Sequence, residues 1–185
     1  YEGGIRLMEI TFDQKNPDSF PVTANAIAEI GAKYQGRMLV GAGTVTTPEL
    51  VELAAKAGAK YIISPDVNVE VIRRTRELGL VSMPGAMTPS EVMTAHNAGA
   101  DYVKLFPAGE LGTSYVKAIR APISHVKLLA VGGINEKNVA DYMAAGMCGA
   151  GVGGNLANKK WIEAGEFHKI TETARELLAA AKSVK

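Results

Sequence analysis

Residues 79–107 read Gly-Leu-Val-Ser-Met-Pro-Gly-Ala-Met-Thr-Pro-Ser-Glu-Val-Met-Thr-Ala-His-Asn-Ala-Gly-Ala-Asp-Tyr-Val-Lys-Leu-Phe-Pro. An apolar run follows Gly79, and Thr88-Pro89 has the pattern of an N-cap followed by proline at the first helical position. Gly99 then ends the predicted helix, since glycine readily adopts the left-handed conformation found after many helix C-termini. A second apolar run follows. The stretch therefore predicts a strand, a helix and another strand.

The same pattern recurs along the chain, and Thr47-Pro48 marks another helix start. Gly58, Gly79 and Gly99 are about 20 residues apart, the length of a compact βα unit. The last predicted helix covers residues 166–182. Glycine precedes a predicted strand at Gly4, Gly58, Gly79, Gly99 and Gly146. The predicted strands are Leu7–Thr11, Leu39–Gly43, Tyr61–Ser64, Val81–Pro84, Tyr102–Phe106, Lys127–Val131 and Gly149–Gly153.

Strands that alternate with helices predict an α/β fold with a parallel sheet. We expect a TIM (β/α)₈ barrel in a single domain over residues 1–185, with the first βα unit missing, because the chain opens at the tail of a helix. An open doubly wound sheet is the alternative. The barrel is favoured because the glycine pairs Gly132-Gly133 and Gly153-Gly154 follow the last two predicted strands, where barrels commonly hold phosphate.

Composition narrows the function classes. The 185 residues are 47% hydrophobic, with 20 basic and 19 acidic side chains and a net charge of +1. No run of like charges or long apolar stretch appears, so we expect no nucleic-acid partner and no membrane contact, and a small molecule as the partner. Cys148 is the one cysteine, which excludes an internal disulfide and predicts a cytoplasmic protein.

Lys104 is the one charged side chain in the apolar run Tyr102–Phe106. Desolvation lowers the pKa of a buried lysine and releases the neutral amine, which can attack a carbonyl to form a Schiff base. The alternative is a lysine whose amine reaches water at the strand end. Phe106 shares the face of Lys104 by the strand period of two and either walls the amine against water or packs in an ordinary core.

Glu9 and Thr44 are further candidates. Strand alternation places Glu9 on one face with Leu7 and Thr11, where a carboxylate can move protons or form a structural ion pair. Thr44 follows two glycines that let a ligand approach the backbone, and its hydroxyl can bind a carboxylate or simply belong to a turn. Pro65 closes a predicted strand, where proline commonly just ends the hydrogen-bond ladder.

The glycine pairs Gly132-Gly133 and Gly153-Gly154, the latter followed by Asn155, expose backbone amides at loops that lead into helices, which predicts an anion site. The three histidines fall in helices or loops and are interpreted as structural or solvated. We interpret Cys148 as a small buried side chain rather than a nucleophile. Because no cluster has metal-ligand spacing, we expect no metal and no other cofactor, and covalent amine chemistry is favoured.

Several motifs together resemble those of the 2-keto-3-deoxy-6-phosphogluconate and 4-hydroxy-2-oxoglutarate aldolase family, and they follow the family's order over nearly the whole chain. They are Glu9-Ile-Thr11, Gly41-Ala-Gly-Thr-Val45, Ile63-Ser-Pro65, Pro84-Gly85 with Thr88-Pro89 and Glu91, Val103-Lys-Leu-Phe-Pro-Ala108, Gly132-Gly-Ile134 and Gly153-Gly154.

The resemblance implies a class I aldolase without metal, usually a homotrimer, that cleaves a 2-keto-3-deoxy sugar acid to pyruvate and an aldehyde. The substrate it implies is 2-keto-3-deoxy-6-phosphogluconate or 4-hydroxy-2-oxoglutarate. It makes Lys104 the Schiff-base lysine and Glu9 the acid/base. Thr44 would hold the pyruvate carboxylate, with Pro65 and Phe106 shaping the pocket. The distal phosphate would meet Gly132, Gly133, Gly153, Gly154 and Asn155.

The chain departs from the family pattern at three positions that bear on the substrate. Asp13 stands where many members have a carboxylate-binding arginine, and Val131 and Asn155 replace a threonine and a serine of the phosphate loops. These changes weaken the prediction of a phosphorylated substrate. The missing first strand commonly supplies another active-site arginine, so the chain as given is expected to be poorly active or inactive.

Two other functions fit the same pattern. One is a barrel isomerase, epimerase or synthase acting on a sugar phosphate, with Lys104 as an electrostatic group. The other is a non-catalytic barrel that serves as a self-assembling scaffold. One fold can serve all three functions, because fold does not fix function. Imine formation with pyruvate distinguishes the aldolase from the other two.

Overall fold

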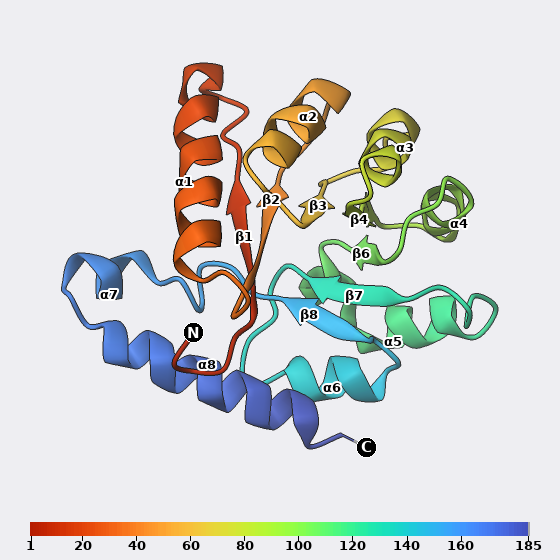
Figure 1. The fold of residues 1–185 in the computed structure, drawn as a ribbon. Helices are drawn as coiled ribbons and strands as arrows, with labels where there is room; N and C mark the ends of the chain where they lie inside the picture. Colours follow the sequence, from red (N-terminus) through yellow and green to blue (C-terminus); the bar gives the residue numbers. More distant parts are fainter. Residues whose placement is uncertain (185) are drawn as a thin grey trace. The chain divides into compact units, whose positions relative to one another are not determined.

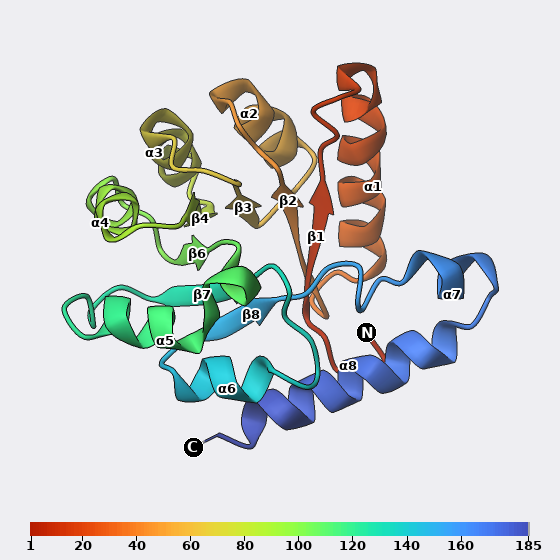
Figure 2. The same cartoon turned by 180° about the vertical axis from the view of Figure 1, so that it is seen from behind.

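The structure, a computed structural model, describes residues 1–184, in which helices alternate with strands (Figures 1 and 2). The strands are β1 (Leu7–Thr11), β2 (Leu39–Gly43), β3 (Tyr61–Ile63), β4 (Val81–Met83), β5 (Gly85–Ala86), β6 (Val103–Leu105), β7 (Leu128–Val131) and β8 (Gly149–Gly151). The helices are the 3₁₀ turn η1 (Pro17–Ser19), α1 (Phe20–Lys33), α2 (Pro48–Lys56), α3 (Val69–Glu77), α4 (Pro89–Asn97), α5 (Ala108–Arg120), α6 (Val139–Ala144), α7 (Lys159–Glu163) and α8 (Phe167–Lys182).

The chain forms two compact units. The first unit covers Arg6–Lys104, and its strands β1 to β4 make a parallel sheet in sequence order. The register of the first pair joins Leu7 to Leu39 and Thr11 to Gly43. Parallel pairing confirms the α/β class predicted from the alternation of strands and helices.

Helices α1, α2 and α3 lie along one face of this sheet (Figure 1). Phe12 is part of the hydrophobic core between the sheet and these helices. Its ring makes an edge contact with the ring of Phe20 at a centroid distance of 5.4 Å. Burying such side chains is the main favourable term of folding. The cluster consists of Phe12, Ile27, Val40, Ala42, Val45, Leu50, Val51, Ala54, Ala59, Ile62 and Val71.

The predicted helix boundaries are confirmed by their caps. The Thr47 side chain accepts a hydrogen bond from the Leu50 amide, and Thr88 forms a capping box with Glu91. Gly58, Gly79 and Gly99 all have the positive φ expected of glycines that end helices.

Replacing Thr88 with alanine should lower the free energy of unfolding by about 1 kcal/mol, the usual cost of losing a threonine N-cap. Chemical denaturation followed by circular dichroism measures this difference. The matched control is Thr94→Ala, because that exposed threonine lies within the same helix α4 and not at its N-cap. An equal effect at both positions would contradict the role of the cap.

The second unit consists of Tyr1–Ile5 and the chain from Leu105 onward. Its strands β7 and β8 are parallel, with Leu129 opposite Gly149, and helices α6 and α7 both pack against α8 (Figure 2). Gly3 lies so close to α8 that a Cβ there would be 2.8 Å from the Thr171 carbonyl oxygen. The N-terminal residues therefore belong to the helical layer of this unit.

The strands are shorter than predicted at several ends. β3, β4 and β8 stop before Ser64, Pro84 and Val152, and β5 is an additional two-residue strand that sequence periodicity does not detect. Pro84 explains the early end of β4, because proline cannot donate to a strand ladder. None of the helices within residues 1–184 is long and apolar enough to cross a membrane.

Candidate active site

Glu9 points from β1 across β2. Its backbone is level with Gly41, and its carboxylate lies over Gly43, where an added Cβ would collide with it. The two glycines of β2 thus provide the space that the carboxylate occupies. Glu9 keeps an exposed surface because β1 is the outer strand of its sheet. Desolvation of the carboxylate nevertheless raises the pKa of Glu9, and the Lys104 charge partly offsets this rise.

Lys104 lies at the centre of β6, between the fully buried Val103 and Leu105. Its backbone N–H donates a 2.8 Å hydrogen bond to the Pro84 carbonyl. Desolvation lowers the pKa of the Lys104 amine, while the Glu9 carboxylate acts in the opposite direction. The structure therefore brings the two predicted residues close enough for their charges to interact.

Asp101 fixes the chain just before β6. Its carboxylate accepts the Ser82 backbone N–H at 2.8 Å and pairs with Arg76 at 2.7 Å. The Asp101 N–H returns a 3.0 Å bond to the Ser82 carbonyl. These bonds set the alignment of β6 beside β4, and hence the position of Lys104.

Thr44 has an unusual backbone. Its φ of 56° makes it the one non-glycine residue with a positive φ in the described chain. The Gln14 side-chain amide donates a 2.7 Å hydrogen bond to the Thr44 carbonyl. The Thr46 hydroxyl in turn donates to Gln14 Oε1 at 3.3 Å. Thr44 is therefore held in a strained turn at the end of β2.

Tyr61 is a neighbour of Glu9 that sequence reasoning missed. Its ring covers Gly41, so any side chain at Gly41 would overlap it. Burial raises the pKa of the Tyr61 phenol, and the Glu9 carboxylate raises it further. A large aromatic residue beside a strand glycine is the signal that could have revealed this contact.

Pro65 follows β3 and lies against β5, since a side chain at Gly85 would collide with the Pro65 carbonyl. The preceding Ser64 is buried, and its hydroxyl donates to the Val45 carbonyl at 2.7 Å. The turn that carries Pro65 is thus joined to the turn that carries Thr44. The first unit brings together Glu9, Thr44, Pro65 and Lys104.

The remaining predicted residues belong to the second unit. Phe106 is 40% exposed, so it is not an ordinary core side chain. A side chain at Gly132 would lie 3.1 Å from the Phe106 ring, and one at Gly133 would lie 3.2 Å from Gly109 Cα. Both glycines have positive φ. Close approach and backbone conformation therefore both require glycine in this loop.

The second glycine loop is open. A Cβ at Gly153 or Gly154 would have no atom within 4 Å, and the Gly153 carbonyl accepts the Ala157 N–H at 3.0 Å. The Asn155 side chain donates to the Ile134 carbonyl at 3.3 Å. Asn155 therefore links the two glycine loops. The sequence predicts that Asn155 binds an anion, and it does not predict this contact.

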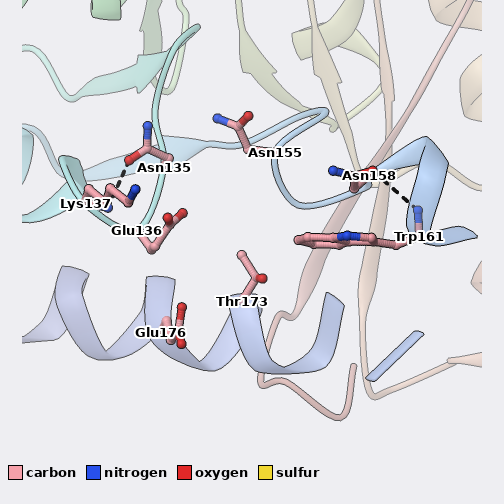
Figure 3. Close-up of a pocket in the computed structure, with 8 residues that line it drawn as sticks. All are labelled: Asn135, Glu136, Lys137, Asn155, Asn158, Trp161, Thr173 and Glu176. Carbon is pink, nitrogen blue, oxygen red and sulfur yellow. Dashed lines mark hydrogen bonds between the residues drawn. The ribbon is translucent and has the colours of Figure 1, made fainter. Parts of the chain in front are cut away.

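A pocket of about 230 Å³ adjoins the second loop (Figure 3). The Trp161 ring forms one wall, opposite the loop after β7, and Thr173 projects into the pocket from α8. Asn155 is the one residue that it shares with the predicted site. Neither Lys104 nor Glu9 lines it. Its lining residues are Asn135, Glu136, Lys137, Asn155, Asn158, Trp161, Thr173 and Glu176.

The prediction for Cys148 was wrong in part. The residue is exposed, with its thiol donating to the Leu128 carbonyl at 3.1 Å, because it precedes β8 at a strand start rather than within a core. Partial desolvation of the sulfur still raises the pKa of the Cys148 thiol, which disfavours a nucleophilic thiolate. Among residues 1–184, no group of three or more His, Cys, Asp or Glu is arranged to hold a metal ion.

Comparison with known proteins gives the family. Residues 1–173 match the family model described as KDPG and KHG aldolase. The probable 2-dehydro-3-deoxy-6-phosphogalactonate aldolase of Rhizobium meliloti (strain 1021) is 39% identical over 184 residues, which are 99% of this chain and 82% of that protein. The 2-dehydro-3-deoxy-6-phosphogalactonate aldolase of Escherichia coli (strain K12) is 36% identical over 168 residues, covering 90% and 78%.

A solved structure agrees. The KDPG aldolase from Legionella pneumophila, with pyruvate captured at low pH as a covalent carbinolamine intermediate, superposes with a TM-score of 0.83 and 29% identity, covering 95% of this chain and 82% of that one. The parallel α/β fold is shared with this aldolase, a carbon–carbon lyase. The chain belongs to the KDPG and KHG aldolase family.

Proposed function

We propose that the chain is a class I aldolase that cleaves a 2-keto-3-deoxy sugar acid to pyruvate and an aldehyde, with Lys104 as the Schiff-base lysine and Glu9 as the acid/base. The observation that carries this proposal is the pairing of a lysine whose pKa is lowered with a carboxylate whose pKa is raised. Opposed shifts of this kind favour the neutral amine, which attacks a carbonyl, and a carboxyl that can give and take a proton.

The proposed reaction begins when the neutral Lys104 amine attacks the keto carbon, forming a carbinolamine that loses water to give an iminium. Glu9 removes the proton of the C4 hydroxyl, the C3–C4 bond breaks, and its electron pair moves to the iminium nitrogen. An aldehyde leaves and an enamine remains. Glu9 then returns the proton to C3, and hydrolysis of the iminium releases pyruvate and the free amine.

Different residues are proposed to bind the two ends of the substrate. The Thr44 hydroxyl holds the carboxylate next to the keto carbon, and Pro65 and Phe106 shape the surrounding pocket. The amides of Gly132, Gly133, Gly153 and Gly154, with the Asn155 side chain, meet the distal end. The positive φ values of Gly132 and Gly133 and the open surroundings of Gly153 and Gly154 support this role, since successive exposed amides bind anions.

The proposed substrate is a 6-phosphorylated 2-keto-3-deoxy sugar acid, in the galactonate or gluconate configuration. Two relatives at 39% and 36% identity carry names for the phosphogalactonate compound, and these names support it as the first candidate. The other candidate is 4-hydroxy-2-oxoglutarate, since Val131 and Asn155 offer no hydroxyl donor to a phosphate.

The finer architecture is also a proposal. We infer a TIM (β/α)₈ barrel that acts as a single domain, supported by the strand and helix alternation and by the 0.83 TM-score. We also propose a cytoplasmic homotrimer that needs no cofactor. Sedimentation equilibrium tests the trimer.

Pyruvate with borohydride should add one reduced pyruvate to Lys104, because reduction makes the imine permanent. Peptide mass spectrometry locates the adduct, and a panel of keto acids with and without phosphate then ranks substrates by kcat/KM. A folded protein that turns over a sugar phosphate without an adduct would favour an isomerase. A folded oligomer with no pyruvate affinity would favour a scaffold.

A further inference from the structure

Gln14 is a residue for which the family resemblance assigns no role. It follows Asp13, which stands where many family members have a carboxylate-binding arginine. The structure turns Asp13 away from that task, since its carboxylate accepts the Lys15 backbone N–H at 3.0 Å in a local turn. Gln14 instead reaches across 30 residues of sequence to the carbonyl of Thr44.

The hydrogen bond from Gln14 to Thr44 is short, and a second hydrogen bond holds the Gln14 side chain in place. Gln14 Nε2 donates to the Thr44 oxygen at 2.7 Å, and Gln14 Oε1 accepts the Thr46 hydroxyl at 3.3 Å. A neighbouring backbone bond, from the Phe12 N–H to the Gly43 carbonyl at 3.0 Å, holds the two segments in register. The amide thus spans the turn from Thr44 to Thr46 using both of its polar ends.

The turn needs such support. A threonine with φ of 56° is in the left-handed region, where the close approach of Cβ to the backbone is unfavourable for a β-branched residue. Strained conformations persist only where surrounding contacts determine them, and they cluster at ligand sites. Gln14 supplies a direct contact to the peptide unit that carries the strain.

We propose that Gln14 is a positioning residue that holds Thr44 in its left-handed conformation and so aims the Thr44 hydroxyl at the substrate carboxylate. This inference rests on the proposed function, because it takes Thr44 as the carboxylate-binding group. It assigns Gln14 to binding of the keto acid rather than to the proton transfers at Lys104 and Glu9.

The test measures the pyruvate concentration that gives half-maximal borohydride trapping at Lys104. Pyruvate is a suitable probe because the carboxylate and the keto group are its only polar groups. Gln14→Met keeps the side-chain length and removes both polar ends. It should raise the half-saturating concentration about three- to tenfold, as expected for the loss of one hydrogen bond, and leave the maximal trapping rate within about twofold.

A double-mutant cycle separates positioning from general damage. If Gln14 acts through Thr44, then Gln14→Met should add nothing to the half-saturating concentration once Thr44→Ala has removed the hydroxyl. Equal effects in the two backgrounds would overturn the proposal. Gln35→Met, the same change at an exposed glutamine after α1, should match the wild type.

Other outcomes are also decisive. Wild-type protein that is never trapped refutes the proposed function, whereas trapped wild type with an unchanged Gln14→Met half-saturation refutes only the positioning role. If Gln14→Met does not fold by circular dichroism, Thr46→Val carries the test. That variant removes the hydroxyl that supports Gln14 and should raise the half-saturating concentration to a smaller extent, and an unchanged value would overturn the proposal.

Discussion

Lys104→Met should abolish pyruvate trapping and lower kcat/KM by at least about a thousandfold, since the remaining groups cannot form the imine. Methionine preserves the length and the apolar stem of the side chain. The variant is measured by peptide mass spectrometry after borohydride and by a coupled assay of pyruvate release. Lys60→Met, at an exposed lysine before β3, is the matched control and should behave as wild type.

The same variant should be more stable than wild type at neutral pH. The folded pKa of Lys104 is lowered, so the unfolded chain binds more protons between that value and the ordinary 10.5. The ammonium therefore destabilises the fold most at low pH, and the gain from Lys104→Met should vanish above about pH 10.5. Denaturant unfolding at several pH values checks this. A variant that is inactive and also less stable would indicate a structural lysine.

Much of the fold follows from local signals in the sequence. Threonine-proline pairs and glycines mark helix ends because cap geometry is set by one or two residues, and Thr88 and Gly99 adopt the predicted conformations. The two-residue strand β5 could not be predicted in the same way. It is defined by pairing rather than by a hydrophobic period, and its glycine is required by the approach of the Pro65 carbonyl.

Only some residues of the candidate site could be predicted, because the others depend on contacts between distant parts of the chain. Lys104 and Glu9 are conspicuous because a charge inside an apolar strand is costly. Tyr61 and Gln14 are not, since their importance depends on contacts with Gly41 and Thr44 that are set only when the chain folds. A buried tyrosine and an exposed loop glutamine have no periodicity that separates them from ordinary residues.

Glu9→Gln should lower kcat by about a hundredfold to ten-thousandfold, the range for loss of a general acid/base. It should still form the imine with pyruvate, because the Lys104 amine remains. The glutamine also removes the negative charge that favours the ammonium, so the pKa of Lys104 falls further. The rise of the trapping rate with pH should therefore shift to lower pH, which rapid-quench measurements across pH will detect.

Gly43→Ala provides an independent test of the same carboxylate. A methyl group there collides with the Glu9 carboxylate, so it should displace Glu9 without changing its charge. We expect a loss of kcat approaching that of Glu9→Gln. Gly31→Ala is the control, because a Cβ at that helical glycine meets no atom within 4 Å. If Gly43→Ala folds and retains full kcat, the position of Glu9 over β2 is not the one used in catalysis. The proton transfers would then require another group.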